Sequence, residues 1–367
     1  MLWVAATLSA TGSAQQGAPG KDGPYKVLKT ARVGGEGGWD YIFADDAGRR
    51  IYIPRGAAKA IPATDTTPAV AEVGPRLTVF NLDTLAPVGE IPGVGGNGAT
   101  VDPKSGHGFT SDHPKVSMFD TKTLTLIKSI DVGAARPDGI LFDSFNQRVY
   151  VFSHPTKDAT VIDSKDGTVL GTIDLGGVPE QGVADGKGTL YVVMQDAVGS
   201  VTVVDVKTMK ATAHYSLVDK GGCNGLALDV KNQVLFAACG RSGNPPAVPP
   251  QPMMVILSAK DGKILANLPL AGSSDGAAFN PPTMEAFSTH GNGTMTIIKE
   301  KSPTEFEVEQ DLKTMNGART ITFDSKTGHV LAMAQERGPA PPPPAGSGRG
   351  PQAPVITGSF TILVMGK

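Results

Sequence analysis

A pattern of short apolar runs separated by polar turns recurs seven times along the chain. In each unit a short polar step, in most units preceded by Gly, leads into an apolar run that ends in Asp or Asn. These runs end at Asp45, Asp102, Asp143, Asp185, Asp229, Asn280 and Asp324. Because units of roughly forty residues are too short to bury an apolar face alone, they have to stack against one another.

Each unit continues with further runs of strand character. In the third unit these are RVYVFS at 148–153, ATVID at 159–163 and, after an Asp-Gly turn, TVLGTID at 168–174. β-Branched and aromatic residues favour strands, and the Gly, Asp and Asn between them favour turns. Four strands in each of seven units predict an all-β fold, a seven-bladed β-propeller of four-stranded blades.

The two ends of the repeat region complement each other. The seventh unit stops after its third run, at 360–365, and so lacks a fourth strand. The segment 25–33 (YKVLKTARV) precedes the first unit and has strand character. We therefore predict one propeller domain over 25–367, with its ring closed by this N-terminal strand and no open sheet edge. Since nothing in such a ring demands pairing with a second copy, we expect a monomer.

The beginning of the sequence differs from the rest in composition. The apolar run LWVAATL is followed closely by Gly12, Ser13 and Ala14. An apolar run before small residues is typical of a signal peptide, so we predict a signal peptide at 1–14, a linker at 15–24 and a periplasmic or secreted protein. The alternative is an apolar N-terminal tail. No other segment approaches the ~18 apolar residues of a membrane span.

One segment resembles a known repeat family. ATVIDSKDGTVLGTIDLGGVPEQGVADGKGTLYVV (159–193) is similar to the YVTN repeat, whose family includes YncE-like periplasmic proteins. Parts of the namesake tetrapeptide stand at 52–54, 150–152 and 191–193. The resemblance extends over 25–367 and implies a seven-bladed propeller and a secreted location. It implies little about activity, because this fold carries many unrelated functions.

The up-and-down order of the strands predicts which residues share a face. Links between blades and loops between second and third strands meet at one face, which also holds the mouth of the central channel. We call this the mouth face. An inner ring of candidate ligand-binding residues starts the first strands: Asp40, Asn97, Asp138, Gln181, Asn224, Asp275 and Arg319. A second ring at the ends of the second strands contains Arg55, His113, His154, Gln195, Cys239, His290 and Gln335, of which Arg55, Gln195 and Gln335 are further candidate ligand-binding residues.

Three of the histidines fall in the second ring. His113, His154 and His290, together with Asp138, are candidate catalytic residues, because imidazoles beside carboxylates suit acid–base chemistry and divalent metals. For a metal site the candidates are His113, His154 and Asp138, which belong to adjacent units. A divalent metal is the only cofactor these residues suggest. The alternative is that they are ordinary polar loop residues and that the acids order the turns.

Three classes of function are compatible with this pattern. The first is a propeller that binds a small molecule, a peptide or a protein at the mouth face without being an enzyme. The second is a metal-assisted lactonase, hydrolase or lyase using the same residues. The third, implied by the resemblance, is single-stranded DNA binding. It ranks last, since the net charge is −2 and only 6% of residues are aromatic, whereas that mode needs a basic groove with stacking rings.

Three loops between second and third strands are long, at 56–76, 240–252 and 337–354. The last two are rich in Pro and favour extended conformations. All three are predicted to leave the mouth face. They suit either a rim or lid that contacts a partner or a set of tolerated insertions.

The two cysteines, Cys223 and Cys239, flank one predicted hairpin. If Asp229 pairs with Gln233 across its turn, the antiparallel register places Cys223 opposite Cys239. Opposed cysteines are within reach of a disulfide, and an exported protein meets an oxidising environment. The alternative is a pair of buried free thiols.

Overall fold

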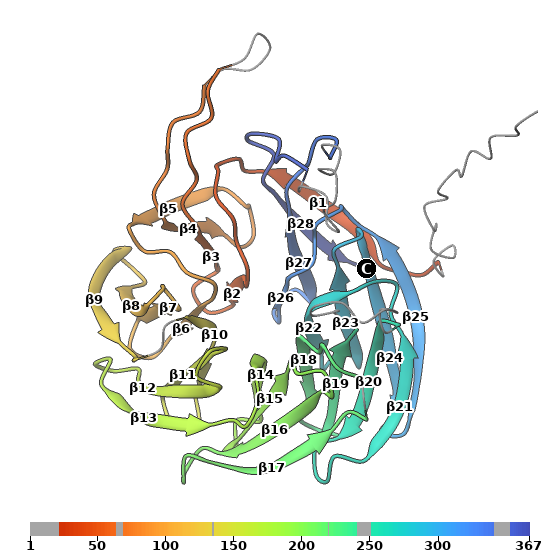
Figure 1. Cartoon of the computed structure of the whole chain (residues 1–367). Coiled ribbons are helices and arrows are strands. Elements are labelled where there is room, and N and C mark those ends of the chain that lie inside the picture. The colour runs from red at the N-terminus through yellow and green to blue at the C-terminus, as the bar shows by residue number, and fades with distance from the viewer. Residues whose placement is uncertain (1–21, 64–68, 134–135, 219, 241–250, 341–352) are drawn as a thin grey trace, which may run out of the picture.

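The computed structural model describes residues 22–63, 69–133, 136–218, 220–240, 251–340 and 353–367. In these residues 28 strands form seven four-stranded antiparallel sheets, which are arranged as blades around a central axis (Figure 1). The predicted all-β, seven-bladed propeller is therefore confirmed. The predicted signal peptide at 1–14 lies outside the described residues, and so does most of the linker at 15–24.

The first three blades consist of consecutive strands. Blade one contains β2 (Phe43–Asp45), β3 (Arg50–Arg55), β4 (Arg76–Asn81) and β5 (Pro87–Pro92). Blade two contains β6 (Ala99–Asp102), β7 (His107–Thr110), β8 (Lys115–Asp120) and β9 (Thr125–Asp131). Blade three contains β10 (Pro137–Asp143), β11 (Arg148–Ser153), β12 (Asp158–Asp163) and β13 (Val169–Asp174).

The next three blades have the same order. Blade four contains β14 (Pro179–Ala184), β15 (Thr189–Met194), β16 (Ser200–Asp205) and β17 (Lys210–Ser216). Blade five contains β18 (Gly225–Asp229), β19 (Val234–Cys239), β20 (Met253–Ser258) and β21 (Ile264–Pro269). Blade six contains β22 (Ser274–Asn280), β23 (Glu285–His290), β24 (Thr294–Ser302) and β25 (Glu305–Lys313).

Blade seven combines strands from the two ends of the repeat region. It contains β26 (Ile321–Asp324), β27 (His329–Ala334), β28 (Thr361–Gly366) and, as its outermost strand, β1 (Lys26–Arg32). β1 runs antiparallel to β28, with Lys26 opposite Gly366 and Arg32 opposite Thr361 (Figure 1). This pairing closes the ring as the sequence predicts.

Burial along the strands explains why the repeat pattern produces stacked blades. The second and third strands are buried over nearly their whole length, whereas the outermost strands are largely exposed. The hydrophobic core is divided among the interfaces between neighbouring blades. At the interface of blades four and five, for example, Tyr191 and Val193 pack in one cluster with Leu226 and Leu235. A blade therefore depends on its neighbours for its burial.

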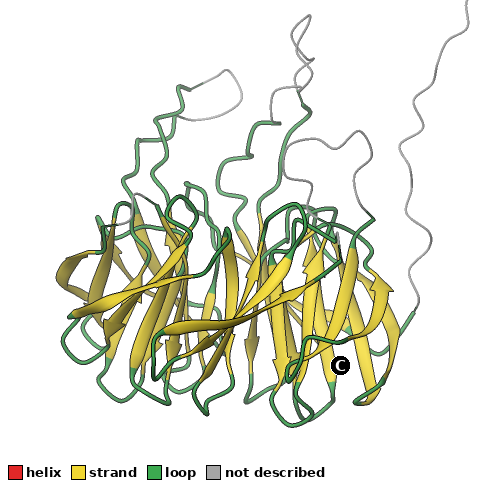
Figure 2. Ribbon diagram, turned by 60° about the horizontal axis from the view of Figure 1, so that its bottom comes forward, coloured by secondary structure: helices red, strands yellow, loops and turns green. Residues whose placement is uncertain are grey.

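The mouth face carries the long loops. The described parts of the loops that follow β3 and β27 rise from the same side of the ring (Figure 2). The first is a narrow ribbon with backbone bridges between Ala58 and Val73 and between Ile61 and Val70. Residues 64–68, 241–250 and 341–352 of the three predicted loops lie outside the described residues.

The central channel is lined by residues of the first strands of all seven blades. It encloses a cavity of about 380 Å³ whose lining includes Ile42, Ile140 and Leu226 beside the polar Gln181. In the part of the chain that the structure describes, no helix has the length and apolar character needed to cross a membrane.

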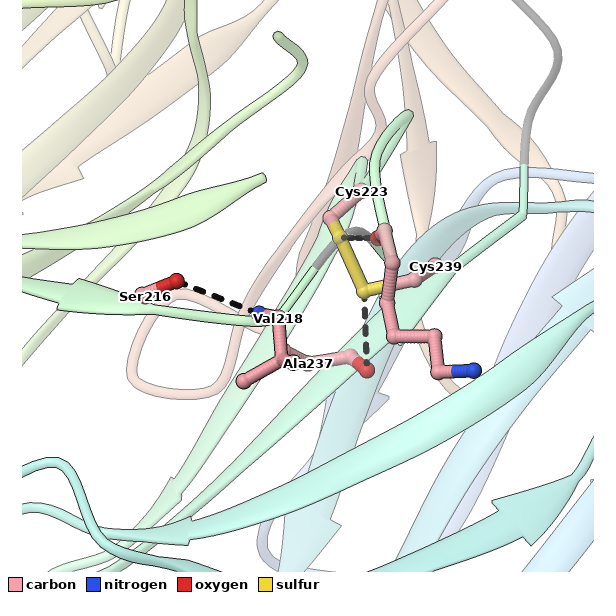
Figure 3. Close-up of a disulfide and its surroundings, with 6 residues drawn as sticks. Ser216, Val218, Cys223, Ala237 and Cys239 are labelled. Atoms are coloured by element: carbon pink, nitrogen blue, oxygen red, sulfur yellow. Dashed lines mark hydrogen bonds between the residues drawn. A yellow bond between two sulfur atoms is a disulfide. The ribbon is translucent and has the colours of Figure 1, made fainter. Parts of the chain in front are cut away.

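The two cysteines of blade five are joined by a disulfide (Figure 3). The strand register of this hairpin differs from the predicted one, because Asp229 lies opposite Val234 and not Gln233. Gln233 has a positive φ and belongs to the turn. The cysteines still meet because the pairing between the first two strands of a blade is irregular near the mouth.

The same kind of irregularity is present in blade three. There Pro137 lies opposite Ser153, and the register has shifted by one residue when Ile140 meets Val151. Blades four and six show an equivalent shift. Cys223 and Cys239 occupy the position of the Pro137–Ser153 pair, so the shift compensates for the one-residue difference in the turn.

Candidate site at the channel mouth

Polar residues that begin the first strands form two hydrogen-bonded groups around the mouth. In one group the side-chain amide of Asn97 donates to Asp138. In the other, Asn224 donates a 3.1 Å hydrogen bond to Asp275, and the guanidinium of Arg319 lies 3.0 Å from Asp275 and 4.0 Å from Asp40. Six of the seven residues of the predicted inner ring therefore contact another member.

Gln181, the seventh member, has a different role. Its Oε1 accepts hydrogen bonds of 3.0 Å from the backbone N–H groups of Leu226 and Ala277, and its Nε2 donates to the carbonyl of Ala277. These contacts connect blades four, five and six below the mouth. Gln181 is thus used in holding the first strands together.

His154 lies beside two carboxylates that come from different blades. Its Nε2 is 2.8 Å from Oδ2 of Asp138, which belongs to β10 of blade three. The same nitrogen is 3.4 Å from Oε1 of Glu180, in β14 of blade four. The side chains of Asp138 and Glu180 are nearly buried, at 9% and 5% exposure, whereas the side chain of His154 is 30% exposed. The imidazole is therefore the part of this cluster that faces solvent at the mouth.

Neutral donors hold both carboxylates in place. Glu180 accepts hydrogen bonds of 2.6 Å from the Tyr41 hydroxyl at Oε2 and from the Gln195 amide at Oε1. Asp138 accepts from Asn97 at Oδ1. Fixed donors around a carboxylate restrict its orientation, so the oxygens that face His154 have defined positions.

The two carboxyl groups of the cluster have opposite protonation behaviour. Burial, together with the negative charge of Asp138, raises the pKa of Glu180 to about 8. For Asp138 burial also acts to raise the pKa, but the contact with His154 outweighs it and the pKa is lowered. Burial acts to lower the pKa of His154, but Asp138 outweighs it and the pKa is raised. With no cation bound, Glu180 is therefore largely protonated at neutral pH, while the contact between Asp138 and His154 favours the ionised form of each.

The structure brings together two of the four candidate catalytic residues, Asp138 and His154. His113 is exposed, and its Nε2 lies 3.2 Å from the side-chain oxygen of Asn97. His290 is buried in blade six, where its Nδ1 lies 2.9 Å from the Thr294 hydroxyl. Burial lowers the pKa of His290 to about 3, so it stays neutral.

A one-residue difference separates His154 from the buried members of the second ring. His154 follows the last residue of β11, whereas Arg55, Cys239 and His290 are themselves the last residues of β3, β19 and β23. Because successive side chains of a strand point to opposite faces, this difference directs the side chains of Arg55, Cys239 and His290 into the packed blades. All three are at most 2% exposed.

Arg55 shows what this burial does to a predicted ligand-binding residue. Its guanidinium donates to the carbonyls of Gly35 and Gly37 and lies 3.7 Å above the ring of Phe360. Burial lowers its pKa to about 9. Of the other second-ring residues, Gln195 contacts Glu180, and Gln335 is buried directly after β27.

Sequence reasoning missed Glu180 and Tyr41. Pro179 lies opposite Met194 as Pro137 lies opposite Ser153, which makes Glu180 the structural equivalent of Asp138. The sequence prediction had given this place to Gln181, because Gln181-Gly182 resembles Asp138-Gly139. The proline before each acid was the available signal for the correct alignment.

These features define the class of the protein: a seven-bladed β-propeller with a charged cluster at the mouth of its channel. No family model matches the chain, and no curated protein matches it. Many solved structures are similar in fold, and three of them illustrate the likeness. A chain of Kuenenia stuttgartiensis hydrazine synthase is 15% identical, with a TM-score of 0.66, over 80% of this chain and 91% of that chain.

The other two similar structures come from unrelated settings. A chain of the mitotic checkpoint complex is 10% identical with a TM-score of 0.65, over 99% of this chain and 98% of that chain. The Pan2 WD40 domain of Neurospora crassa is 12% identical with a TM-score of 0.62, over 89% of this chain and 88% of that one. At such identities the likeness concerns the fold alone.

Proposed function

We propose that this protein is an exported propeller that binds a small polar ligand at the mouth face. The observation that carries the proposal is the cluster of Asp138, His154 and Glu180, because two nearly buried carboxylates meet a solvent-facing imidazole there. Charged groups that converge in a concave site are typical of ligand binding.

The surroundings of the cluster favour a small ligand at the mouth over one that passes through the channel. Tyr41 and Gln181 extend from blades one and four to other blades and occupy the space beneath the mouth. The acidic centre, with Asp40, Asp138 and Asp275, also disfavours a nucleic acid, because phosphates would meet like charge. We therefore do not extend the proposal to single-stranded DNA.

Export remains part of the proposal. The apolar N-terminal segment with its small residues motivates it, and the disulfide of blade five supports it. Structural disulfides persist in oxidising compartments such as the periplasm. Fractionation of cells that express residues 1–367 would test this, and recovery of the protein with the cytosolic fraction would contradict it.

A screen with matched variants tests ligand binding. Sugars, amino acids, organic acids and nucleotides are added singly, and the shift in melting temperature is recorded, since a ligand that binds the native state raises it. We expect hits whose shift is lost in His154→Ala and kept in His329→Ala, which changes a histidine at the start of β27, away from the mouth. Hits that persist in His154→Ala, or a screen without hits, would contradict the proposal.

A second candidate function is metal-assisted hydrolysis at the same cluster. The observation that favours it is the placement of an imidazole and two carboxylates within reach of one small ion. Assays of acid release from a simple lactone and a simple ester, with and without added zinc, test it. Turnover that is insensitive to His154→Ala would exclude this cluster as the active site.

A further inference from the structure

The geometry points to a site for one divalent transition-metal ion, with Asp138 Oδ2, His154 Nε2 and Glu180 Oε1 as its protein ligands. Among the described residues these three offer ligand atoms that all lie within 4.8 Å of one another. The inference deepens the proposed function, since it identifies what would hold a ligand at the mouth. It rests on that proposal for its biological meaning but not for its test.

The distances fit a common metal ion. Ligands at about 2.1 Å from a zinc ion, arranged around a tetrahedron, are separated from one another by roughly 3.4 Å. The Nε2 atom of His154 is 2.8 Å from Asp138 Oδ2 and 3.4 Å from Glu180 Oε1. Small side-chain adjustments would bring all three atoms to bonding distance of one ion.

The position of His154 Nε2 supports the same site. This nitrogen is buried and lies 2.8 Å from Asp138 Oδ2 and 3.4 Å from Glu180 Oε1, so one atom faces both carboxylates. Once its proton is displaced, its lone pair is directed toward the space shared with the two carboxylate oxygens, as in a metal-bound imidazole.

The residues around the cluster resemble the outer shell of a metal site. Asn97 donates to the second oxygen of Asp138, and Tyr41 donates to the second oxygen of Glu180. Gln195 donates to Glu180 Oε1, which keeps a further lone pair. Such donors orient ligating carboxylates and are a regular part of metal centres. A divalent cation would also offset the charge of two adjacent carboxylates, which otherwise disfavour joint ionisation.

The donor set indicates which metals to expect. One imidazole with two carboxylates suits zinc or manganese, whereas calcium and magnesium prefer oxygen ligands alone. By the usual order of affinities, zinc should bind more tightly than manganese. Three protein ligands leave at least one coordination position of such an ion open. A ligand with a carboxylate or hydroxyl group could occupy it.

Calorimetric titration of the full chain with zinc chloride and manganese chloride, after removal of metals and without an affinity tag, tests this inference. We expect one zinc ion per chain. Glu180→Gln and His154→Ala should each weaken binding by about tenfold or more, while His329→Ala should leave it within about twofold. His329 is the control, because it is a histidine at the start of β27, away from the mouth.

Three outcomes would overturn the inference. They are the absence of saturable binding to the wild type, binding that survives both Glu180→Gln and His154→Ala, and equal losses in His329→Ala and His154→Ala. If Glu180→Gln does not fold, as judged by circular dichroism, Asp138→Asn replaces it with the same expectation. The titration contains no organic ligand, so a negative result does not affect the melting-temperature screen. The metal site and the ligand-binding function can therefore be refuted separately.

Discussion

The hydroxyl of Tyr41 donates a hydrogen bond of 2.6 Å to Glu180, although the two residues belong to blades one and four. The contact crosses the mouth of the channel. Burial, followed by the charge of Glu180, raises the pKa of Tyr41 well above its ordinary value, so Tyr41 remains a neutral donor. The position of the Glu180 carboxylate therefore depends on a residue from the far side of the ring.

Tyr41→Phe tests this dependence. The substitution removes the donor to Glu180 Oε2 and keeps the ring, so we expect zinc affinity to fall by about tenfold while the fold is retained. Tyr215→Phe is the control, because its hydroxyl contacts the carbonyl of Ala259 on the outer part of blades four and five. Calorimetric titration of both variants with zinc measures this change in affinity. Equal zinc affinity in the wild type and Tyr41→Phe would show that the contact does not orient Glu180.

The closure of the ring gives a second prediction. Deletion of 25–33 would remove β1 and leave β28 as an unpaired edge, so we expect a lower melting temperature and aggregation. Gln310→Ala is a milder test. Gln310 in blade six accepts a 2.9 Å hydrogen bond from the backbone N–H of Tyr25 and donates one of 2.9 Å to its carbonyl.

Gln310→Ala should therefore lower the free energy of unfolding by about 1 to 3 kcal/mol, because it leaves two buried backbone groups unpaired. Urea denaturation measures this. A deletion variant with the same melting temperature as the full-length protein would show that β1 does not contribute to closure.

The architecture could be predicted from the sequence because it depends on the spacing of the repeated units. The spacing of the runs, and the three-strand seventh unit beside an unpaired segment at 25–33, are independent of any single residue position. Strand pairing follows from such patterns, because alternation and turns fix which segments can be neighbours.

The site could be predicted only in part because it depends on single positions. A shift of one residue at the start of β14 makes Glu180, and not Gln181, the partner of His154. A shift of one residue at the end of β23 buries His290. The pairing near the mouth is the same in blades three, four and six, so both errors are one-residue misalignments between units, which the period of the repeat alone does not resolve.

The disulfide of blade five gives a third prediction. Denatured, unreduced protein should contain no thiol that reacts with a thiol reagent, since Cys223 and Cys239 are its only cysteines and are bonded to each other. Reduction should lower the free energy of unfolding by about 3 kcal/mol, the value for a loop of about 15 residues. The double variant Cys223→Ser, Cys239→Ser should match the reduced protein. Two reactive thiols per chain would refute the bridge.

His290 gives the last prediction, which concerns pH. Its pKa in the native state is about 3 because of burial, whereas an unfolded histidine titrates near 6.5. Between these values the unfolded state binds a proton that the native state does not, so the free energy of unfolding falls as the pH falls. We expect a contribution of about 1.4 kcal/mol per pH unit from this group below pH 6.

Urea denaturation of the wild type and His290→Asn at several pH values between 7 and 4 measures this contribution. Asparagine does not titrate and keeps a polar atom near Thr294, the partner of Nδ1. The variant loses stability at neutral pH through its smaller volume, so the slopes are compared and not the absolute values. We expect a shallower slope for His290→Asn than for the wild type, and the wild-type slope for His329→Asn. Parallel curves for the wild type and His290→Asn would mean that His290 becomes protonated in the native state as readily as in the unfolded one.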